Sequence, residues 1–315
     1  MLVLWIIIGA FVGWYVFTFV VAMFQTAYMY HMEKKCSRRE EGLVRKKALS
    51  DSGRLIVSEE YKFTFFPNDN GKRSPLIIIC PGGGYKYLCT EKEGFSTAMR
   101  LNEYGLSAFV FEYGTGKDCF DMSPMKELAA LIRHVQENED RYNVDSKNYI
   151  LIGFSAGGNL AGMFGTKEEG YLKYGLNKPM AVFLGYFWTS DPEYYKHHCV
   201  NPWIWLLDRH LFFRGNQIMF KKKKFTEWEK NALALHKHID KDYPKAYLFS
   251  GTQDIVVPHK LQCGLVENAI AQNHVEHIYH VFKSMPHGVA VGDFTNASGW
   301  LTEALSFAGV EYLEK

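Results

Sequence analysis

The chain has 315 residues, of which 47% are hydrophobic, 22% charged and 16% aromatic, and its formal net charge is +2. This balance is typical of a folded globular protein and excludes wholesale disorder. A nucleic-acid-binding protein usually has a much larger excess of basic residues, so no nucleic-acid partner is expected.

The N-terminal segment is long and apolar. No charged residue occurs from Leu2 to Phe24, and a helix of roughly 23 residues is about 34 Å long, enough to cross a bilayer core of about 30 Å. A cleaved signal peptide fits less well, because no basic residue precedes the run and no small-residue cleavage site follows it. A buried core helix of this length would usually have a polar face. We therefore predict a transmembrane anchor over residues 1–31.

Basic residues gather on one flank of this run. None precedes it, and seven follow it closely: Lys34, Lys35, Arg38, Arg39, Arg45, Lys46 and Lys47. The positive-inside rule therefore predicts an outside N-terminus and a main domain in the cytoplasm. Residues 32–53 are charged and lack periodic apolar spacing, so we expect a juxtamembrane linker there.

The cysteines and histidines predict no metal site. The six cysteines have no C-x-x-C pair and no regular spacing, which argues against thiolate ligation and fits unpaired thiols in a reducing compartment. His197-His198 and His236-x-His238 have no matching carboxylate pattern, so metal binding is not expected at either pair.

From about residue 54 the pattern alternates between two kinds of segment. Continuous apolar runs, the form that strands buried on both faces take, occur at 76–80 and 107–111, and further strands are predicted at 149–152, 181–184, 246–249 and 277–282. Helices are predicted over 123–139, 258–272 and about 298–307. Strands that alternate with helices indicate an α/β domain, residues 54–315, whose mostly parallel sheet is covered on both faces.

The segment from about 187 to 243 interrupts this alternation. It is rich in tryptophan and lies between two predicted strands, so we interpret it as a helical cap inserted over the site. Its aromatic residues either line an acyl or aryl pocket or simply pack the cap onto the core. They are Trp188, Trp203, Trp205, Phe212, Phe213 and Phe220. The lysine run 221–224 is a solvated charged segment or, as a hypothesis, a contact with anionic lipid head groups.

One motif has the local context that its chemistry requires. Gly153-Phe154-Ser155-Ala156-Gly157 matches G-x-S-x-G, follows a predicted strand directly and precedes a predicted helix. A serine at such a turn is strained and exposed, and small neighbours avoid clashes within the turn. A glycine-rich turn with an incidental serine is the alternative, and it leaves this context unexplained. Ser155 is therefore the predicted nucleophile.

A glycine run after the strand at 76–80 is the second motif. Pro81-Gly82-Gly83-Gly84-Tyr85 can bring the main chain close to a substrate, as acyl transfer requires when backbone N–H groups stabilise the oxyanion. The predicted donors are Gly83 and Gly84, together with Ala156. A phosphate-binding loop is the competing interpretation, but its G-K-[ST] ending and its G-x-G-x-x-G form are absent.

Two further residues complete a candidate triad. Asp254 lies just past the predicted strand 246–249, and His287 lies in a loop beyond the last predicted strand. His287 is the predicted base and Asp254 the acid that orients it, with Asp191 as the alternative acid.

These motifs, in this order, resemble the acetyl-esterase and xylan-esterase-like branch of the α/β hydrolases. In that fold serine, aspartate and histidine follow in the same chain order. The similarity covers nearly everything from about Tyr61 to the C-terminus except the insertion. Two positions depart from the pattern. Pro81 stands where the lipase-like branch has a histidine, and Tyr113-Gly114 stand where Tyr-Arg often ends the strand.

The resemblance implies an α/β-hydrolase-fold serine hydrolase that needs no metal or organic cofactor. Its expected substrate is a small-molecule carboxylic ester, such as an O-acetyl group on a sugar. A lipid or lysolipid esterase is the alternative that the anchor favours, and a peptidase is weaker. A membrane-tethered binding protein with an inactive hydrolase fold is the non-enzymatic alternative, against which the intact Ser155, Asp254 and His287 argue.

Overall fold

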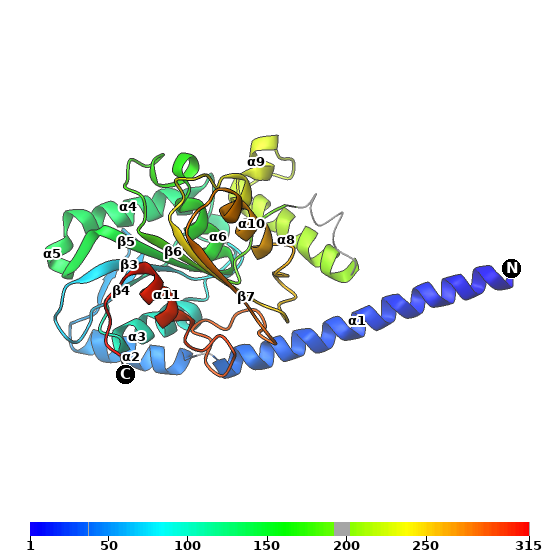
Figure 1. The fold of residues 1–315 in the computed structure, drawn as a ribbon, viewed down its shortest axis with the longest axis horizontal. Helices are drawn as coiled ribbons and strands as arrows, with labels where there is room; N and C mark the ends of the chain where they lie inside the picture. Colours follow the sequence, from blue (N-terminus) through cyan, green and yellow to red (C-terminus); the bar gives the residue numbers. More distant parts are fainter. Residues whose placement is uncertain (37, 192–201, 315) are drawn as a thin grey trace.

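A single sheet organises the molecule. The structure is a computed structural model that describes residues 1–36, 38–191 and 202–314. Over these residues one eight-stranded sheet has the order β1-β2-β4-β3-β5-β6-β7-β8 (Figure 1). Its strands are β1 Ile56–Ser58, β2 Phe63–Phe66, β3 Ser74–Cys80, β4 Ala108–Phe111, β5 Val144–Phe154, β6 Ala181–Gly185, β7 Lys245–Gly251 and β8 His277–Phe282.

The six predicted strands form the parallel part of this sheet. Ile78 of β3 pairs in parallel with Phe109 of β4 and with Leu151 of β5, and the parallel order continues through β8. The short strands β1 and β2 escaped the sequence analysis and add an antiparallel edge. The α/β-hydrolase fold and its mostly parallel sheet are therefore confirmed.

Helices cover both faces of the sheet, and alternate strand residues point to opposite layers. Ile78, Leu151 and Leu184 face the layer formed by α4, α6 and α10. Ile77 and Ile79 face the layer formed by α3 and α11. The longer helices are α1 Leu2–Cys36, α2 Arg39–Asp51, α3 Ser96–Glu103, α4 Ser123–Glu137, α6 Ser155–Phe164, α8 Pro202–Phe220, α10 Cys263–Gln272 and α11 Trp300–Ala308. Short helices are η1 Thr90–Phe95, η2 Gly116–Asp118, α5 Glu139–Tyr142, η3 Lys167–Tyr171, α9 Glu227–Asn231 and η4 Leu235–Lys237.

The segment expected as a juxtamembrane linker is instead part of the folded body. Helix α1 continues to Cys36, and α2 packs against η1 and α3. Cys36 and Leu49 are buried in the α3–α11 layer. Arg45 pairs with Asp69 at 2.5 Å. The high charge of this segment thus reflects ion pairs with the domain, which a search for apolar periodicity does not detect.

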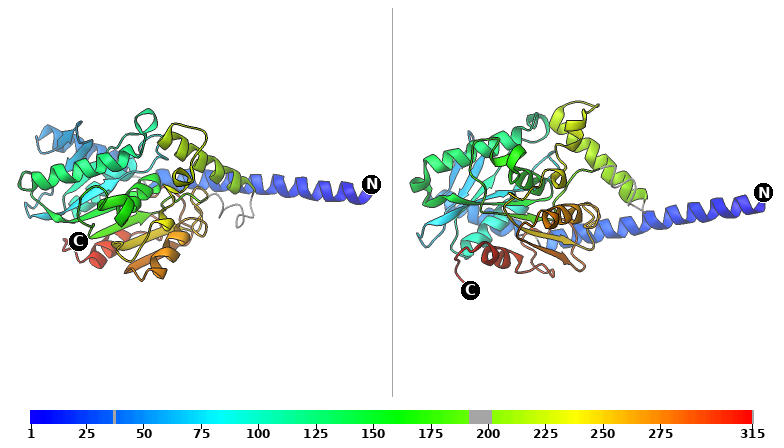
Figure 2. Two further views of the ribbon diagram at one scale, coloured as in Figure 1. Left: turned by 90° about the horizontal axis from the view of Figure 1, so that it is seen from above. Right: turned by 45° about the horizontal axis from the view of Figure 1, so that its top comes forward.

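The uncharged half of α1 projects away from the body (Figures 1 and 2). Its apolar side chains are largely exposed, with Trp5, Phe11 and Phe17 each more than 60% exposed. Over the described residues, α1 is the one helix long and apolar enough to cross a membrane.

Helices α8, α9 and η4 lie between β6 and β7, within the segment predicted as a cap. Residues 192–201 of that segment lie outside the described part of the chain. At its far end Lys222 pairs with Glu229 at 2.5 Å, and the Lys221 ammonium donates to the carbonyl of Gly116. Two of the four lysines thus contact the protein's own body.

Candidate active site

Ser155 stands at the junction of β5 and α6 with a strained backbone. Its φ of +51° lies in the left-handed region, which costs energy for a residue with a side chain. The turn is also tightly packed, because a Cβ on Gly157 would lie 2.1 Å from the carbonyl oxygen of Cys80. Strand, sharp turn and helix thus present the Ser155 hydroxyl at the carboxyl end of the parallel strands, as the motif predicts.

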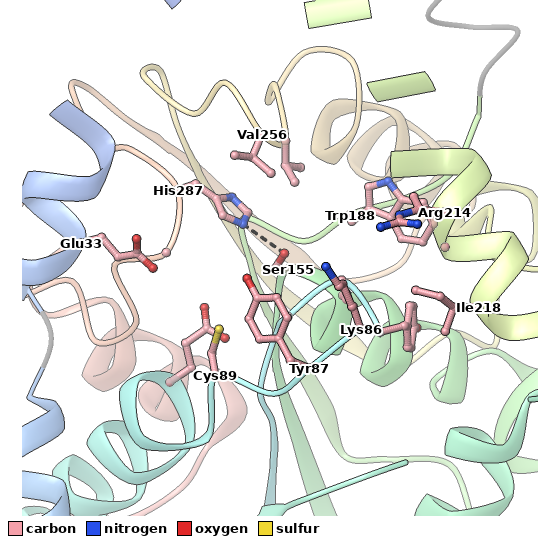
Figure 3. Close-up of a pocket in the computed structure, with 18 of the residues that line it drawn as sticks. Glu33, Lys86, Tyr87, Cys89, Ser155, Trp188, Arg214, Ile218, Val256 and His287 are labelled. Atoms are coloured by element: carbon pink, nitrogen blue, oxygen red, sulfur yellow. Dashed lines mark hydrogen bonds between the residues drawn. The ribbon is translucent and has the colours of Figure 1, made fainter. Parts of the chain in front are cut away.

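Loops after β7 and β8 bring two more predicted residues to this serine. His287 Nε2 lies 3.0 Å from Ser155 Oγ (Figure 3). His287 Nδ1 lies 2.7 Å from Asp254 Oδ2. With Nδ1–H donating to the carboxylate, Nε2 is left to accept the serine proton. The three residues are more than 30 positions apart in sequence and form one continuous chain of hydrogen bonds.

Asp254 is rigidly held. Its side chain is fully buried, and its second oxygen accepts hydrogen bonds from the backbone N–H groups of Val256 at 3.0 Å and Val257 at 2.7 Å. The alternative acid, Asp191, is engaged elsewhere, because it contacts His236 Nε2 at 3.0 Å and Lys237 at 3.2 Å. Of the two predicted acids, Asp254 is the one that the structure places against His287.

The glycine run passes directly beside the nucleophile. A Cβ on Gly82 would lie 2.8 Å from that of Ser155, so only glycine fits there. The Gly82 N–H donates to Glu93 Oε2 at 2.5 Å. Among the described residues, no acceptor takes the N–H groups of Gly83 and Gly84. Both glycines line the pocket next to Ser155 and Ala156, so their N–H groups are available to a ligand.

Glu93, in η1, is a site residue that the sequence analysis missed. It is only 3% exposed, and burial raises the pKa of its carboxyl. Besides Gly82, it accepts a hydrogen bond from the Tyr186 hydroxyl at 3.0 Å. The Tyr186 ring in turn packs edge-on against His287, with centroids 4.8 Å apart. Glu93 therefore links the glycine loop to the histidine loop from behind the site. Nothing in its local sequence marks it as buried.

Two buried tyrosines hold the glycine loop in place. Tyr113 donates from its hydroxyl to the Pro81 carbonyl at 2.7 Å, and Tyr85 donates to Asn159 Oδ1 at 2.9 Å. Burial raises the pKa of both phenols well above the usual range, so both remain neutral donors at neutral pH. Tyr113 keeps the tyrosine of the Tyr-Arg pattern, in which Gly114 replaces the arginine, and this contact is its structural role here.

The pocket over Ser155 has a volume of about 380 Å³ and lies between two helices that are distant in sequence. Met29 and Glu33 of α1 line the pocket, as do Arg214 and Ile218 of α8. Figure 3 shows Glu33 on one side of Ser155 and the two α8 residues on the other.

The aromatic residues of the cap have different roles. Trp188 lines the pocket, Trp203 packs on α1, and Phe220 packs against the core. The side chains of Trp205, Phe212 and Phe213 lie outside the described residues. Both uses weighed for the cap, pocket lining and packing, therefore occur.

Metal ligands are not gathered anywhere in the described part of the chain. No group of three histidine, cysteine, aspartate or glutamate side chains there could hold an ion. His236 contacts Asp191, and His238 Nε2 lies 3.0 Å from the carbonyl oxygen of Asn231. His197 and His198 lie outside the described residues.

Known proteins resemble this chain in sequence and fold. The BD-FAE family model matches residues 64–182. The chain is 27% identical to endo-1,4-beta-xylanase B of Butyrivibrio fibrisolvens, over 76% of this chain and 36% of that protein. It is 26% identical to an acetylxylan esterase of Xylanibacter ruminicola, over 67% of this chain and 38% of that protein. The chain thus spans less than two fifths of either relative.

Among solved structures, the chain resembles an acetyl ester-xyloside bifunctional hydrolase of Caldicellulosiruptor lactoaceticus. The TM-score is 0.62 at 23% identity, over 78% of this chain and 88% of that one. The predicted resemblance to the xylan-esterase-like branch of the α/β hydrolases is therefore confirmed.

Proposed function

We propose that this chain is a membrane-anchored carboxylic ester hydrolase that acts through Ser155, His287 and Asp254. The proposal rests on the hydrogen bonds that link Asp254 to His287 and His287 to Ser155. Beside them lies a glycine loop whose N–H groups have no acceptor among the described residues. Ester hydrolysis needs a nucleophile, a base and an oxyanion site together, and this pocket offers all three.

The reaction would proceed by acyl transfer. His287 accepts the Ser155 proton as Oγ attacks the ester carbonyl, and Asp254 orients the imidazole and stabilises its charged form. The N–H groups of Ala156 and of Gly83 or Gly84 hold the oxyanion. His287 then protonates the departing alcohol, and it activates a water that releases the acyl group.

The substrate that we favour carries a short acyl group, such as acetate on a carbohydrate hydroxyl. The acetylxylan esterase among the relatives and the acetyl ester-xyloside hydrolase among the structural neighbours support this choice. A lipid or lysolipid esterase is the second candidate, because Met29 and Glu33 of the apolar helix α1 help to line the pocket.

We also propose that residues 1–31 anchor the chain in a membrane with the hydrolase domain on the cytoplasmic side. The exposed apolar side chains of α1 support the anchor, and the basic residues after the apolar run support the side. Protease protection of the domain in sealed, right-side-out vesicles tests the orientation.

The first test is hydrolysis of p-nitrophenyl acetate, butyrate and decanoate by the full-length chain in detergent, with Ser155→Ala alongside. We expect turnover of the acetate, and a loss of about 10⁶-fold in kcat for the variant, as when a triad serine is removed. A folded wild-type chain that is inert on all three esters and unlabelled by a fluorophosphonate would indicate a tethered binding protein. Preference for decanoate would favour the lipid esterase.

A further inference from the structure

We infer that the pocket receives its substrate from the bilayer, and that the substrate is an ester on the head group of a membrane-resident amphiphile. This inference rests on the proposed hydrolase function and the proposed anchor, and it names the substrate class of the same site. Three features of α1 and α8 lead to it.

One face of α1 is covered from the middle of its apolar run to its end. Less exposed residues recur three or four positions apart, which places them on one helix face: Tyr15, Thr18, Ala22, Gln25, Met29, Met32 and Cys36. An anchor that served only as a tether would be exposed on every face below the domain. The less exposed face thus continues from the body of the protein into the apolar run of α1.

Helix α8 provides described contacts on that face. The Trp203 indole N–H donates to the Tyr15 carbonyl at 3.1 Å, and the Trp203 ring packs against the rings of Tyr15 and Phe19. Tyr15 and Phe19 precede Phe24, the last residue of the apolar run, by nine and five positions. At about 1.5 Å per residue, Trp203 lies about 8 to 14 Å inside the apolar end of the anchor.

The sequence of α8 suits this depth. Residues 203–207 are Trp-Ile-Trp-Leu-Leu, and the first charged residues, Asp208 and Arg209, follow only then. Leu206 is 45% exposed. An exposed leucine at this level is stabilised by lipid, and it has no such support in water.

The same two helices flank the pocket above this level. Met29 and Glu33, which both line the pocket, lie about 8 and 14 Å beyond Phe24 along α1. Glu33 faces Arg214 and Ile218 of α8 across Ser155 (Figure 3). Helices α1 and α8 therefore meet inside the apolar layer and border the pocket just above it. An amphiphile between them would keep its tail in lipid while its head group reaches Ser155.

The polar groups at the pocket fit a head group. Lys86, His210 and Arg214 line it and are exposed, so the part of the substrate outside the lipid meets hydrogen-bond donors. A soluble polysaccharide has no apolar tail to place between α1 and α8, so it would leave this arrangement unused.

The test uses the full-length chain reconstituted in phosphatidylcholine vesicles and two probes with the same acetylated glucose. One probe is the dodecyl glycoside, which enters the bilayer, and the other is the methyl glycoside, which stays in water. Acetate release is measured at equal bulk concentrations. We expect the dodecyl glycoside to be hydrolysed at least about 10-fold faster, because its tail partitions into the bilayer.

A membrane-bound enzyme would hydrolyse the dodecyl glycoside faster than the methyl glycoside simply because the enzyme and the dodecyl glycoside are concentrated in the same membrane. Matched variants therefore isolate the role of α8. Leu206→Glu and Trp203→Ala should lower hydrolysis of the dodecyl glycoside about 10-fold, because a charge or a lost contact displaces α8 from lipid. Hydrolysis of the methyl glycoside should stay within about twofold. Leu172→Glu is the control, since Leu172 is also an exposed leucine, 54% exposed, and does not line this pocket.

Three results would overturn the inference. The first is equal hydrolysis of both glycosides, and the second is full dodecyl activity in both α8 variants. The third is a preference for lysophosphatidylcholine, which would move the cleaved ester from the head group to the fatty acyl chain. Absence of activity on both glycosides and on p-nitrophenyl acetate would instead refute the proposed ester hydrolysis itself.

Discussion

At the scale of single residues, the site depends on a few side chains held by buried partners. Ser155 carries backbone strain that its tight turn imposes. Two backbone N–H groups donate hydrogen bonds to the Asp254 oxygen that does not face His287. Because its position does not depend on the histidine, this carboxylate can select the imidazole tautomer that the proposed reaction needs.

Replacing Asp254 should therefore reduce turnover and leave the fold intact. Asp254→Asn keeps the size of the side chain and removes the charge that stabilises the histidine proton. We expect kcat on p-nitrophenyl acetate to fall about 10⁴-fold. Asp191→Asn is the matched control and should change kcat less than about threefold, because Asp191 contacts His236 and not His287. Equal losses in both variants would contradict the assignment.

Glu93 makes a different prediction, because it acts through the glycine loop and not on the substrate. Glu93→Ala leaves the Gly82 N–H without its acceptor. We expect kcat to fall about 10- to 100-fold with little change in KM. This loss in kcat is at most that caused by removing one oxyanion donor. Glu93→Gln keeps an acceptor for Gly82 and should recover most of the activity. A KM effect without a kcat effect would contradict this positioning role.

The titration of Glu93 adds a stability readout. Its pKa is raised by burial in the folded chain, so its protonated form stabilises the fold below the ordinary glutamate pKa. That contribution is lost as the pH rises through the raised value. Thermal unfolding of wild type and Glu93→Gln across the acidic to neutral range should therefore show the wild type losing stability relative to the variant as pH rises.

At the scale of elements, α2 shows why charge is a poor guide to disorder. Its segment has few apolar residues, but Leu49 is buried and the basic residues pair with carboxylates of the domain. A short helix needs only one or two buried side chains and suitable ion partners to dock on an existing surface.

The packing of α2 can be tested by its stability. Leu49→Ala should lower the free energy of unfolding by about 2 to 4 kcal/mol, because the side chain is 2% exposed and leaves a cavity. Val44→Ala on the same helix is the control, since Val44 is 69% exposed, and it should cost less than about 0.5 kcal/mol. Chemical unfolding in detergent measures both. Equal, small effects would mean that α2 is a linker after all.

At the scale of the whole molecule, the apolar part of α1 and the folded body are not separable at the residue where the apolar run ends. Residues 25–36 of α1 pack on the body, with the Tyr28 hydroxyl 3.2 Å from the Ser284 carbonyl. Glu33 pairs with Lys92 beside the site, and the Cβ of an alanine at position 288, next to His287, would lie 3.0 Å from Glu33.

Two truncations should consequently behave differently. A chain that begins at residue 25 keeps Met29 and Glu33, which line the pocket, and a chain that begins at residue 38 loses them. We expect the shorter chain to show a KM for p-nitrophenyl butyrate raised by about fivefold or more, because one wall of the pocket is gone. Identical KM values for two folded chains would show that α1 contributes nothing to binding.

The sequence by itself determined the fold class, the six parallel strands and the apolar helix, and it singled out Ser155, His287 and two possible acids, Asp254 and Asp191. These features follow from local patterns, namely apolar runs, turn glycines and a motif in a strand–turn–helix context, which need no knowledge of distant contacts. The BD-FAE match and the structural likeness agree with them.

Only the tertiary structure decided the rest. It paired His287 with Asp254 and not with Asp191, and it buried Glu93 behind the glycine loop. It also docked α2 on the body and brought α8 against α1. Each of these contacts is between segments that are far apart in the chain. Charged or isolated residues such as Glu93 look alike in sequence whether they face water or a buried donor. What distinguishes them is the partner across the fold, and folding alone brings that partner into contact.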